Sequence, residues 1–135
     1  MKNNLLLRYS GCLLAYLLLN PYAAADPVNV QMFFGLVKPG GTPISQQEWK
    51  AFEENTLAST FPGFTVVDAV GYYQHHSLPS KLVILVIDDD DLSKAEWVAS
   101  IYSEHFEQES VMLTTTPLLS WKFVGAPSTK PQKHN

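Results

Sequence analysis

The sequence predicts a single α+β domain in which two helices cover one face of an antiparallel sheet. Segments with apolar residues at every second position alternate with segments whose apolar residues recur three or four positions apart. Their order is β-α-β-β-α-β followed by an extra C-terminal strand, which is the order of the split βαβ, or ferredoxin-like, arrangement. The chain of 135 residues is long enough to form one stable core.

The first half of the predicted domain is a strand, a loop and a helix. From Val28 to Val37 the apolar residues alternate, as in a strand with one buried face. Lys38–Pro43 contains two glycines and two prolines and is typical of a loop. Ser45 and Glu48 have the spacing of a capping box, so a helix should begin there. Phe61-Pro62-Gly63 ends that helix.

Two strands and an acidic segment begin the second half. Phe64 to Tyr73 is rich in β-branched and aromatic residues and predicts a strand. His75–Ser80 is interpreted as a loop. Leu82 to Ile87 is apolar at every position, which indicates a central strand covered on both sides. The acidic run Asp88–Asp91 then leads into a helix, whose positive N-terminal dipole favours carboxylates.

The second helix and the C-terminal strands complete the pattern. Ser93 and Glu96 again have capping-box spacing. The predicted buried stripe of this helix is Trp97, Val98, Ile101, Tyr102 and Phe106. Val111–Thr115 and Leu119–Phe123 are interpreted as short strands separated by Pro117, or as one bent edge strand.

Residues 1–25 are interpreted as an export signal. Lys2 and Arg8 supply positive charge, and Cys12–Leu19 is a short apolar run, far below the ~20 residues of a membrane-spanning helix. Ala23-Ala24-Ala25 fits an export peptidase site, which predicts cleavage after Ala25 and a periplasmic or extracellular protein without a membrane span.

An alternative to cleavage after Ala25 is a lipid anchor on Cys12. Ser10-Gly11-Cys12 resembles part of a lipobox, although Tyr9 lies where that motif has Leu. In either case residues 26–124 form the predicted domain. Gly125–Asn135, rich in Pro, Ser and Lys, is predicted to be a disordered tail.

Composition excludes several classes of function. Nine Lys and Arg against thirteen Asp and Glu give a formal net charge of −4, which disfavours nucleic-acid binding. Removal of residues 1–25 also removes Cys12 and Arg8, the chain's single Cys and single Arg. The remaining domain then has no thiol for disulfides, nucleophilic catalysis or metal ligation, and no cofactor is predicted.

The predicted arrangement leaves one face of the sheet without helices. Phe33, the second face of Leu82–Ile87 and parts of Phe64–Tyr73 indicate that this open face is apolar as well. Because an extended apolar face is unfavourable in water, a second copy of the chain should cover it, or the terminal strand and tail should fold over it. We expect a homodimer.

Four motifs resemble those of a family of small exported bacterial proteins, domain of unknown function 3574. The similarity extends from about Val30 to Phe123, and it implies no established activity. The family often carries Arg after the Phe-Gly pair and Glu shortly before the Ser-Lys pair, where this chain has Leu36 and Leu78. The shared motifs are Phe33-Phe34-Gly35, Phe61-Pro62-Gly63-Phe64-Thr65-Val66-Val67-Asp68, Ser80-Lys81-Leu82 and Gln108-Glu109-Ser110-Val111.

Asp68 is the first candidate for chemistry. It shares strand parity with apolar residues, and a carboxylate buried among them would have a raised pKa suited to a general base. The structural alternative is that Asp68 caps a turn or pairs with Lys81 at the margin of the sheet.

Histidines supply the other candidates. His75 and His76 lie in the predicted loop, where either could act as a general base beside Tyr72 or Tyr73, although adjacent histidines rarely chelate one metal ion. His105 follows the apolar stripe of the second helix and is expected at the edge of the core. With Glu109 it could supply two metal ligands, but no third ligand has fitting spacing.

The sequence therefore favours a non-catalytic exported module that binds an unidentified small molecule or envelope protein, with Tyr73, Lys81 and Glu109 as candidate binding residues. The alternative is a small enzyme of the dimeric α/β-barrel type. It would use Asp68 or a loop histidine as proton acceptor and a neighbouring tyrosine as donor. Such an enzyme requires these side chains to surround one enclosed pocket.

Overall fold

The computed structural model describes residues 24–126. Most of the predicted export signal and of the predicted tail lies outside these residues, and so does Cys12. The described elements, in chain order, are β1 (Pro27–Gly35), α2 (Gln46–Phe52), a π-helical turn (Glu53–Leu57), α3 (Ala58–Thr60), β2 (Thr65–Tyr73), β3 (His76–Asp88), a 3-10 turn (Asp89–Asp91), α4 (Leu92–His105) and β4 (Met112–Pro117).

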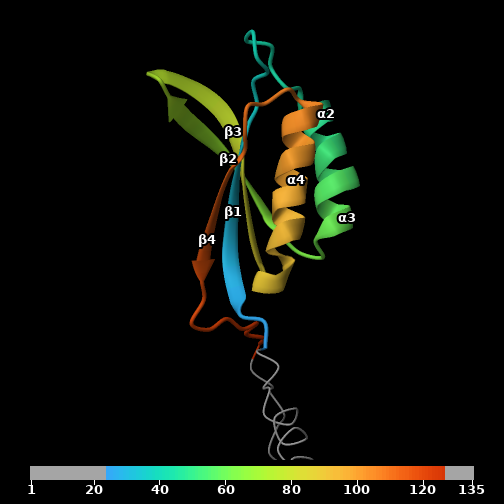
Figure 1. Ribbon diagram of the computed structural model, residues 1–135, viewed down its shortest axis with the longest axis vertical. Coiled ribbons are helices and arrows are strands. Elements are labelled where there is room, and N and C mark those ends of the chain that lie inside the picture. Colours follow the sequence, from blue (N-terminus) through green and yellow to red (C-terminus); the bar gives the residue numbers. More distant parts are fainter. Residues whose placement is uncertain (1–23, 127–135) are drawn as a thin grey trace, which may run out of the picture.

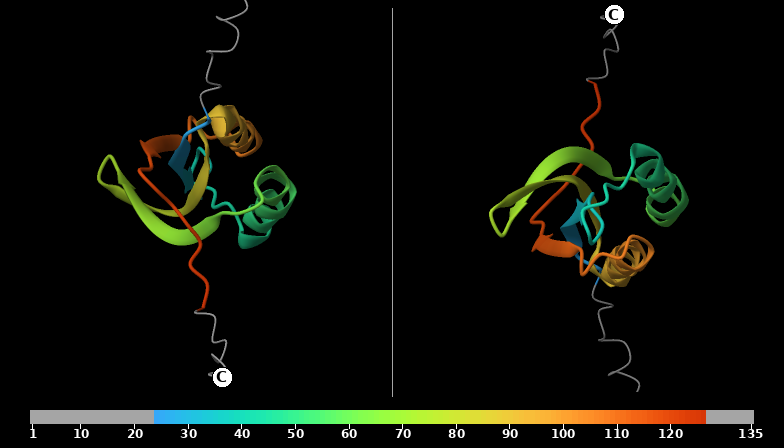
Figure 2. Two further views of the ribbon diagram at one scale, coloured as in Figure 1. Left: turned by 90° about the horizontal axis from the view of Figure 1, so that it is seen from below. Right: turned by 90° about the horizontal axis from the view of Figure 1, so that it is seen from above.

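The four described strands form one antiparallel sheet in the order β2-β3-β1-β4. Both helical segments lie on the same face of this sheet, as Figure 1 and the two end-on views of Figure 2 show. The predicted ferredoxin-like α+β fold is thereby confirmed. None of the described helices is long and apolar enough to cross a membrane.

The predicted extra strand at Leu119–Phe123 is wrong, because the chain after Pro117 in the described region has no strand. Pro117 is the last residue of β4, opposite Val28, and the N–H of Leu118 donates to the carbonyl of Pro27 at 3.0 Å. This bond holds the chain at the end of the sheet where β1 begins. From there the segment leaves the edge on which an extra strand would have to pair.

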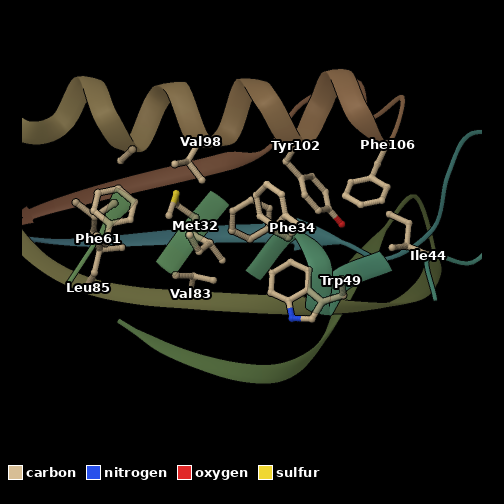
Figure 3. Packing of buried hydrophobic residues seen from close by; sticks show 14 of the residues in the cluster. Met32, Phe34, Ile44, Trp49, Phe61, Val83, Leu85, Val98, Tyr102 and Phe106 are labelled. Atoms are coloured by element: carbon tan, nitrogen blue, oxygen red, sulfur yellow. The ribbon is translucent and has the colours of Figure 1, made fainter. Parts of the chain in front are cut away.

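The core lies between the sheet and the helices. In β1 the residues at every second position, from Val28 to Phe34, are buried against the helices. Phe34 is the centre of an aromatic cluster, with ring centroids 4.7 to 5.6 Å from its neighbours (Figure 3). Those neighbours are Trp49, Phe52 and Tyr102.

The predicted capping box at the start of α2 is confirmed. The Ser45 hydroxyl accepts a hydrogen bond from the Glu48 N–H at 3.2 Å, and the Glu48 carboxylate accepts one from the Ser45 N–H at 2.8 Å. The π-helical turn that follows was not predicted. Its i→i+5 geometry brings Phe52 and Leu57, five residues apart, onto the same buried side of the helix.

The second helix differs from prediction in two respects. It begins at Leu92, directly after the 3-10 turn, so Ser93 lies inside the helix and the predicted Ser93–Glu96 capping box is wrong. Trp97 is 51% exposed and does not belong to the buried stripe. The stripe consists of Ala95, Val98, Tyr102 and Phe106, a narrow face that packs against β1.

The predicted loop His75–Ser80 is also wrong, because β2 and β3 form a hairpin with a two-residue turn. Gln74 and His75 both adopt left-handed backbone conformations, with φ of 47° and 67°, as in a type I′ turn. Pro79 is tolerated in β3 because it lies past the paired end of β1, where its carbonyl accepts from the N–H of Leu36 at 2.9 Å. The tip of this hairpin projects beyond the sheet in Figure 1.

Candidate functional site

Asp68 and Lys81 are direct partners across β2 and β3, on the face of the sheet that carries the helices. Their side chains form an ion pair. The structural alternative for Asp68, pairing with Lys81 at the margin of the sheet, is thereby confirmed. With 87% of its side chain exposed, Asp68 is not the buried carboxylate that general-base catalysis would use.

Lys81 is held more firmly than its carboxylate partner, because its side chain is 20% exposed. Its ammonium lies 5.8 Å from the ring centroid of Trp49, within range of a cation–π interaction. The indole N–H of Trp49 in turn donates to Glu53 at 2.8 Å. The hydrogen bond from Lys50 to Glu53, together with this one, lowers the pKa of Glu53. Through its contact with Trp49, Lys81 takes part in the packing of α2 against the sheet.

The hairpin residues do not surround a common pocket. Strand alternation places Asp68 and Tyr72 on the helix-bearing face, whereas Tyr73 and its partner His76 lie on the opposite face. His75 lies in the turn, and all these side chains are exposed, Tyr72 by 80% and Tyr73 by 68%. The described chain therefore does not form the proton-transfer arrangement that the enzyme alternative requires of these residues.

His105 and Glu109 lie at the end of α4 and in the connection to β4, and both are exposed. The ring of His105 contacts the buried core residue Phe106 edge-on with centroids 4.6 Å apart, so His105 lies at the edge of the core as expected, with its side chain exposed. Between residues 24 and 126, no three His, Asp or Glu side chains gather as a metal site would require. Glu109 is brought together with neither Lys81 nor Tyr73 by any described contact.

Tyr102, which was predicted only as part of the buried stripe, and Gln108 meet at Gly35. The buried Tyr102 hydroxyl donates to the Gly35 carbonyl at 2.6 Å, and burial raises the pKa of Tyr102. The Gln108 amide donates to the Val37 carbonyl at 3.0 Å, and a Cβ on residue 35 would lie 3.3 Å from the Gln108 side-chain oxygen. The Phe-Phe-Gly and Gln-Glu-Ser-Val motifs are thus joined, and their shared role is packing.

The face of the sheet opposite the helices carries exposed apolar side chains. We call it the open face. Figure 2 shows that neither helix covers it. Val67, Val86 and Met112 on this face are 41%, 41% and 57% exposed. Its other residues, read from the strand register, are Asn29, Gln31, Phe33, Thr65, Ala69, Gly71, Tyr73, His76, Leu78, Ser80, Leu82, Ile84, Thr114 and Thr116, with Pro27, Gly35 and Asp88 at the strand ends.

Residues 29–121 match the sequence profile described as protein of unknown function, DUF3574. The chain belongs to this family. The DUF3574 match begins in β1 and ends at Trp121, so it contains both helical segments and nearly the whole sheet. Leu36 and Leu78 lie at the end of the sheet near the hairpin.

No curated protein matches this DUF3574 chain in sequence. Among solved structures, a phage SAM lyase in its apo state has a TM-score of 0.50 at 22% identity, covering 67% of this chain and 79% of the lyase. A phage SAM lyase in complex with S-methyl-5′-thioadenosine has a TM-score of 0.49 at 17% identity, covering 69% and 82%. At these identities the likeness is one of fold.

Proposed function

We propose that this protein is an exported, non-catalytic interaction module that acts as a homodimer through the open face of its sheet. The observation that carries the proposal is the chemistry of that face. Apolar side chains from all four strands lie on it, while the helices cover the other side. Burial of such a face is favourable at about 25 cal/mol per Å² of apolar surface.

The scarcity of charge on the open face favours a second copy as the partner. In a two-fold symmetric contact every residue near the axis approaches its own copy, so like charges there would repel. The chain has a formal net charge of −4, yet the strand register places a single charged residue, Asp88, on the open face. Asp88 lies at the last position of β3, at the margin.

The size of the open face is sufficient for a specific interface. Its strands are nine, nine, thirteen and six residues long. With strands ~4.8 Å apart and a rise of ~3.3 Å per residue, the projected area of the face is on the order of 600 Å². Since side chains make the accessible area larger than the projection, this approaches the ~800 Å² that each partner buries in a standard interface.

The mass of the chain in solution, beginning at Asp26, tests the dimer. Val67→Lys places a charge on the open face, and Val70→Lys places the same charge on the other side of the same strand. Both side chains are exposed, so both variants should fold. We expect a dimer for the parent chain and for Val70→Lys in sedimentation at micromolar concentration, and a monomer for Val67→Lys. A monomeric parent chain, or equal masses for the two variants, would refute the proposal.

Export rests on the sequence of residues 1–25 and is supported by where the fold begins. The first strand starts at Pro27, so cleavage after Ala25 removes no residue of a described element. The test is expression of the whole chain in a Gram-negative host, followed by fractionation and mass measurement. We expect a periplasmic or secreted protein that begins at Asp26. A lipid found on Cys12 would show that the lipid anchor, and not cleavage after Ala25, is correct. An unprocessed cytoplasmic chain would contradict export.

The fold shared with the phage lyase does not extend the proposal to catalysis. The candidate proton acceptors Asp68 and His76 lie on opposite faces of the sheet, and the Asp68 carboxylate is paired with Lys81. A shared fold alone does not carry an activity from one protein to another.

A further inference from the structure

A groove lies at the end of the sheet where β1 begins, with a volume of about 740 Å³. β2 starts opposite Ile84, so Leu85–Asp88 of β3 has no strand beside it on that edge. The Phe61-Pro62-Gly63-Phe64 segment lines the groove, and so do Trp121 and Phe123 from the chain after β4. This volume lies within the ~300–1,000 Å³ of typical small-molecule sites.

The groove combines aromatic rings with a carboxylate that has no cationic partner. Trp121 and Phe123 contact each other edge-to-face with centroids 5.4 Å apart, and they are 53% and 92% exposed. Three charged residues line the groove, of which Lys94 and Asp91 form an ion pair at 2.8 Å. Asp88, among the described residues, has no ion-pair partner, so it gives the groove a net negative charge.

We propose that this groove binds a small organic cation with an apolar body, of the quaternary ammonium class. Aromatic faces attract such a cation through their quadrupoles, and the exposed carboxylate of Asp88 adds Coulomb attraction. The apolar body would fill the space beside Phe64 and Ile84 and be buried there. A simple inorganic cation has no apolar body and would not need this space. This is a site separate from the centre of the open face, although Ile84 and Val86 border both.

The site accounts for a motif that the proposed dimer leaves unexplained. Phe61-Pro62-Gly63-Phe64 lies within the DUF3574 match, which extends past β4 to Trp121. Phe61 is 3% exposed and belongs to the core, whereas Phe64 is partly buried and Pro62 and Gly63 are exposed at the groove. The segment thus has one residue in the core and three that form a wall.

Tryptophan fluorescence of the chain from Asp26, in a Trp97→Phe background, tests the proposal. Trp49 is 3% exposed, so Trp121 is then the exposed indole of the described region. The probes are benzyltrimethylammonium, its neutral carbon isostere neopentylbenzene, and benzoate. We expect saturable quenching by benzyltrimethylammonium, with affinity about tenfold above that of the neutral probe, and no saturation with benzoate.

Matched variants separate the groove from a general acidic field. Asp88→Asn should weaken benzyltrimethylammonium about tenfold, while Asp90→Asn, in the same acidic run but not lining the groove, should not. Trp121→Leu, titrated by calorimetry, should abolish saturable binding. Equal affinity for cation and isostere, equal losses in Asp88→Asn and Asp90→Asn, or no saturation at all would overturn the proposal. If the chain is a monomer in solution but still binds the cation, the proposed dimer is overturned and the proposed groove site is not.

Discussion

The hydroxyl of Tyr102 in α4 donates a 2.6 Å hydrogen bond to the carbonyl of Gly35, the last residue of β1. The same ring packs edge-on against Phe34 at 4.7 Å and Phe52 at 4.9 Å. One side chain therefore fills the centre of the core and also satisfies a backbone carbonyl at the end of the central strand. Burial raises the pKa of Tyr102 because it disfavours the phenolate, so the hydroxyl remains a donor at neutral pH.

Tyr102→Phe should lower the free energy of unfolding by about 1–2 kcal/mol. The ring stays, but the Gly35 carbonyl loses its partner, and an unsatisfied buried acceptor is costly. Chemical denaturation measures the change. Tyr72→Phe is the matched control, because Tyr72 is 80% exposed and its hydroxyl makes no described bond. Equal stability of the two variants would show that the Tyr102 bond contributes nothing.

Replacing Gln74-His75 by Asn-Gly should stabilise the domain by about 1 kcal/mol, or several degrees in Tm. Both residues have positive φ, which is costly for side chains with a Cβ and favoured by Asn-Gly in type I′ turns. Thermal unfolding measures the gain, with Ala-Ala at the same positions as the control. A loss of stability on introducing Asn-Gly would mean that the imidazole of His75 makes a contribution larger than the strain it carries.

The pH dependence of stability should centre on Glu48. A hydrogen bond from Lys38 and further bonds from Ser45 lower the pKa of Glu48 from 4.5 to about 2. A carboxylate with a lowered folded-state pKa stabilises the fold above its unfolded pKa, and this contribution is lost as the pH falls from about 4.5 to about 2. Because Gln keeps the capping box, Glu48→Gln should flatten the fall of Tm across this range. Glu54→Gln, in the exposed turn that follows, is the control and should leave the slope unchanged.

Asp68→Asn should change stability by less than about 0.5 kcal/mol. The carboxylate is 87% exposed, and surface ion pairs contribute little. A double-mutant cycle with Lys81→Met measures the coupling, expected at about 0.2–1 kcal/mol. A coupling of several kcal/mol would assign the pair a larger role than its exposure suggests.

Local signals were enough to predict the first helix, while tertiary contacts decided the features that were mispredicted. Ser45 and Glu48 form their capping box within four residues, so the sequence contains all that is needed. His75–Ser80 was interpreted as a loop, but it belongs to the hairpin. Pro79 is tolerated there because β1, which is distant in sequence, ends beside it. Trp97 has the spacing of a core residue, yet α4 buries Ala95, Val98 and Tyr102 and leaves Trp97 51% exposed.

In the candidate site, too, local patterns were predictable and arrangements that depend on tertiary contacts were not. The apolar open face followed from strand alternation and was predicted, since Phe33 and the second face of Leu82–Ile87 are visible in the sequence. The groove was not predicted, because it joins Phe64, Asp88 and Trp121, which are far apart along the chain. Asp68 was considered as a buried base because strand alternation identifies the face of the sheet on which its side chain lies. Alternation does not show how far the helices extend over that face, and they leave Asp68 exposed.

Processing after Ala25 should add an ion pair to the folded domain. The backbone N–H of Asp26 donates to the Asp89 carboxylate at 3.1 Å, and the Asp89 N–H donates to the Asp26 carbonyl at 2.9 Å. In a chain that begins at Asp26, an α-ammonium replaces the amide beside that carboxylate. Asp89→Asn should then cost more stability in a chain starting at Asp26 than in one retaining Ala24-Ala25, by about 0.2–1 kcal/mol. Salt should reduce this difference, because the pair is exposed. Equal costs in the two chains, measured by thermal unfolding at low ionic strength, would show that the new terminus does not reach Asp89.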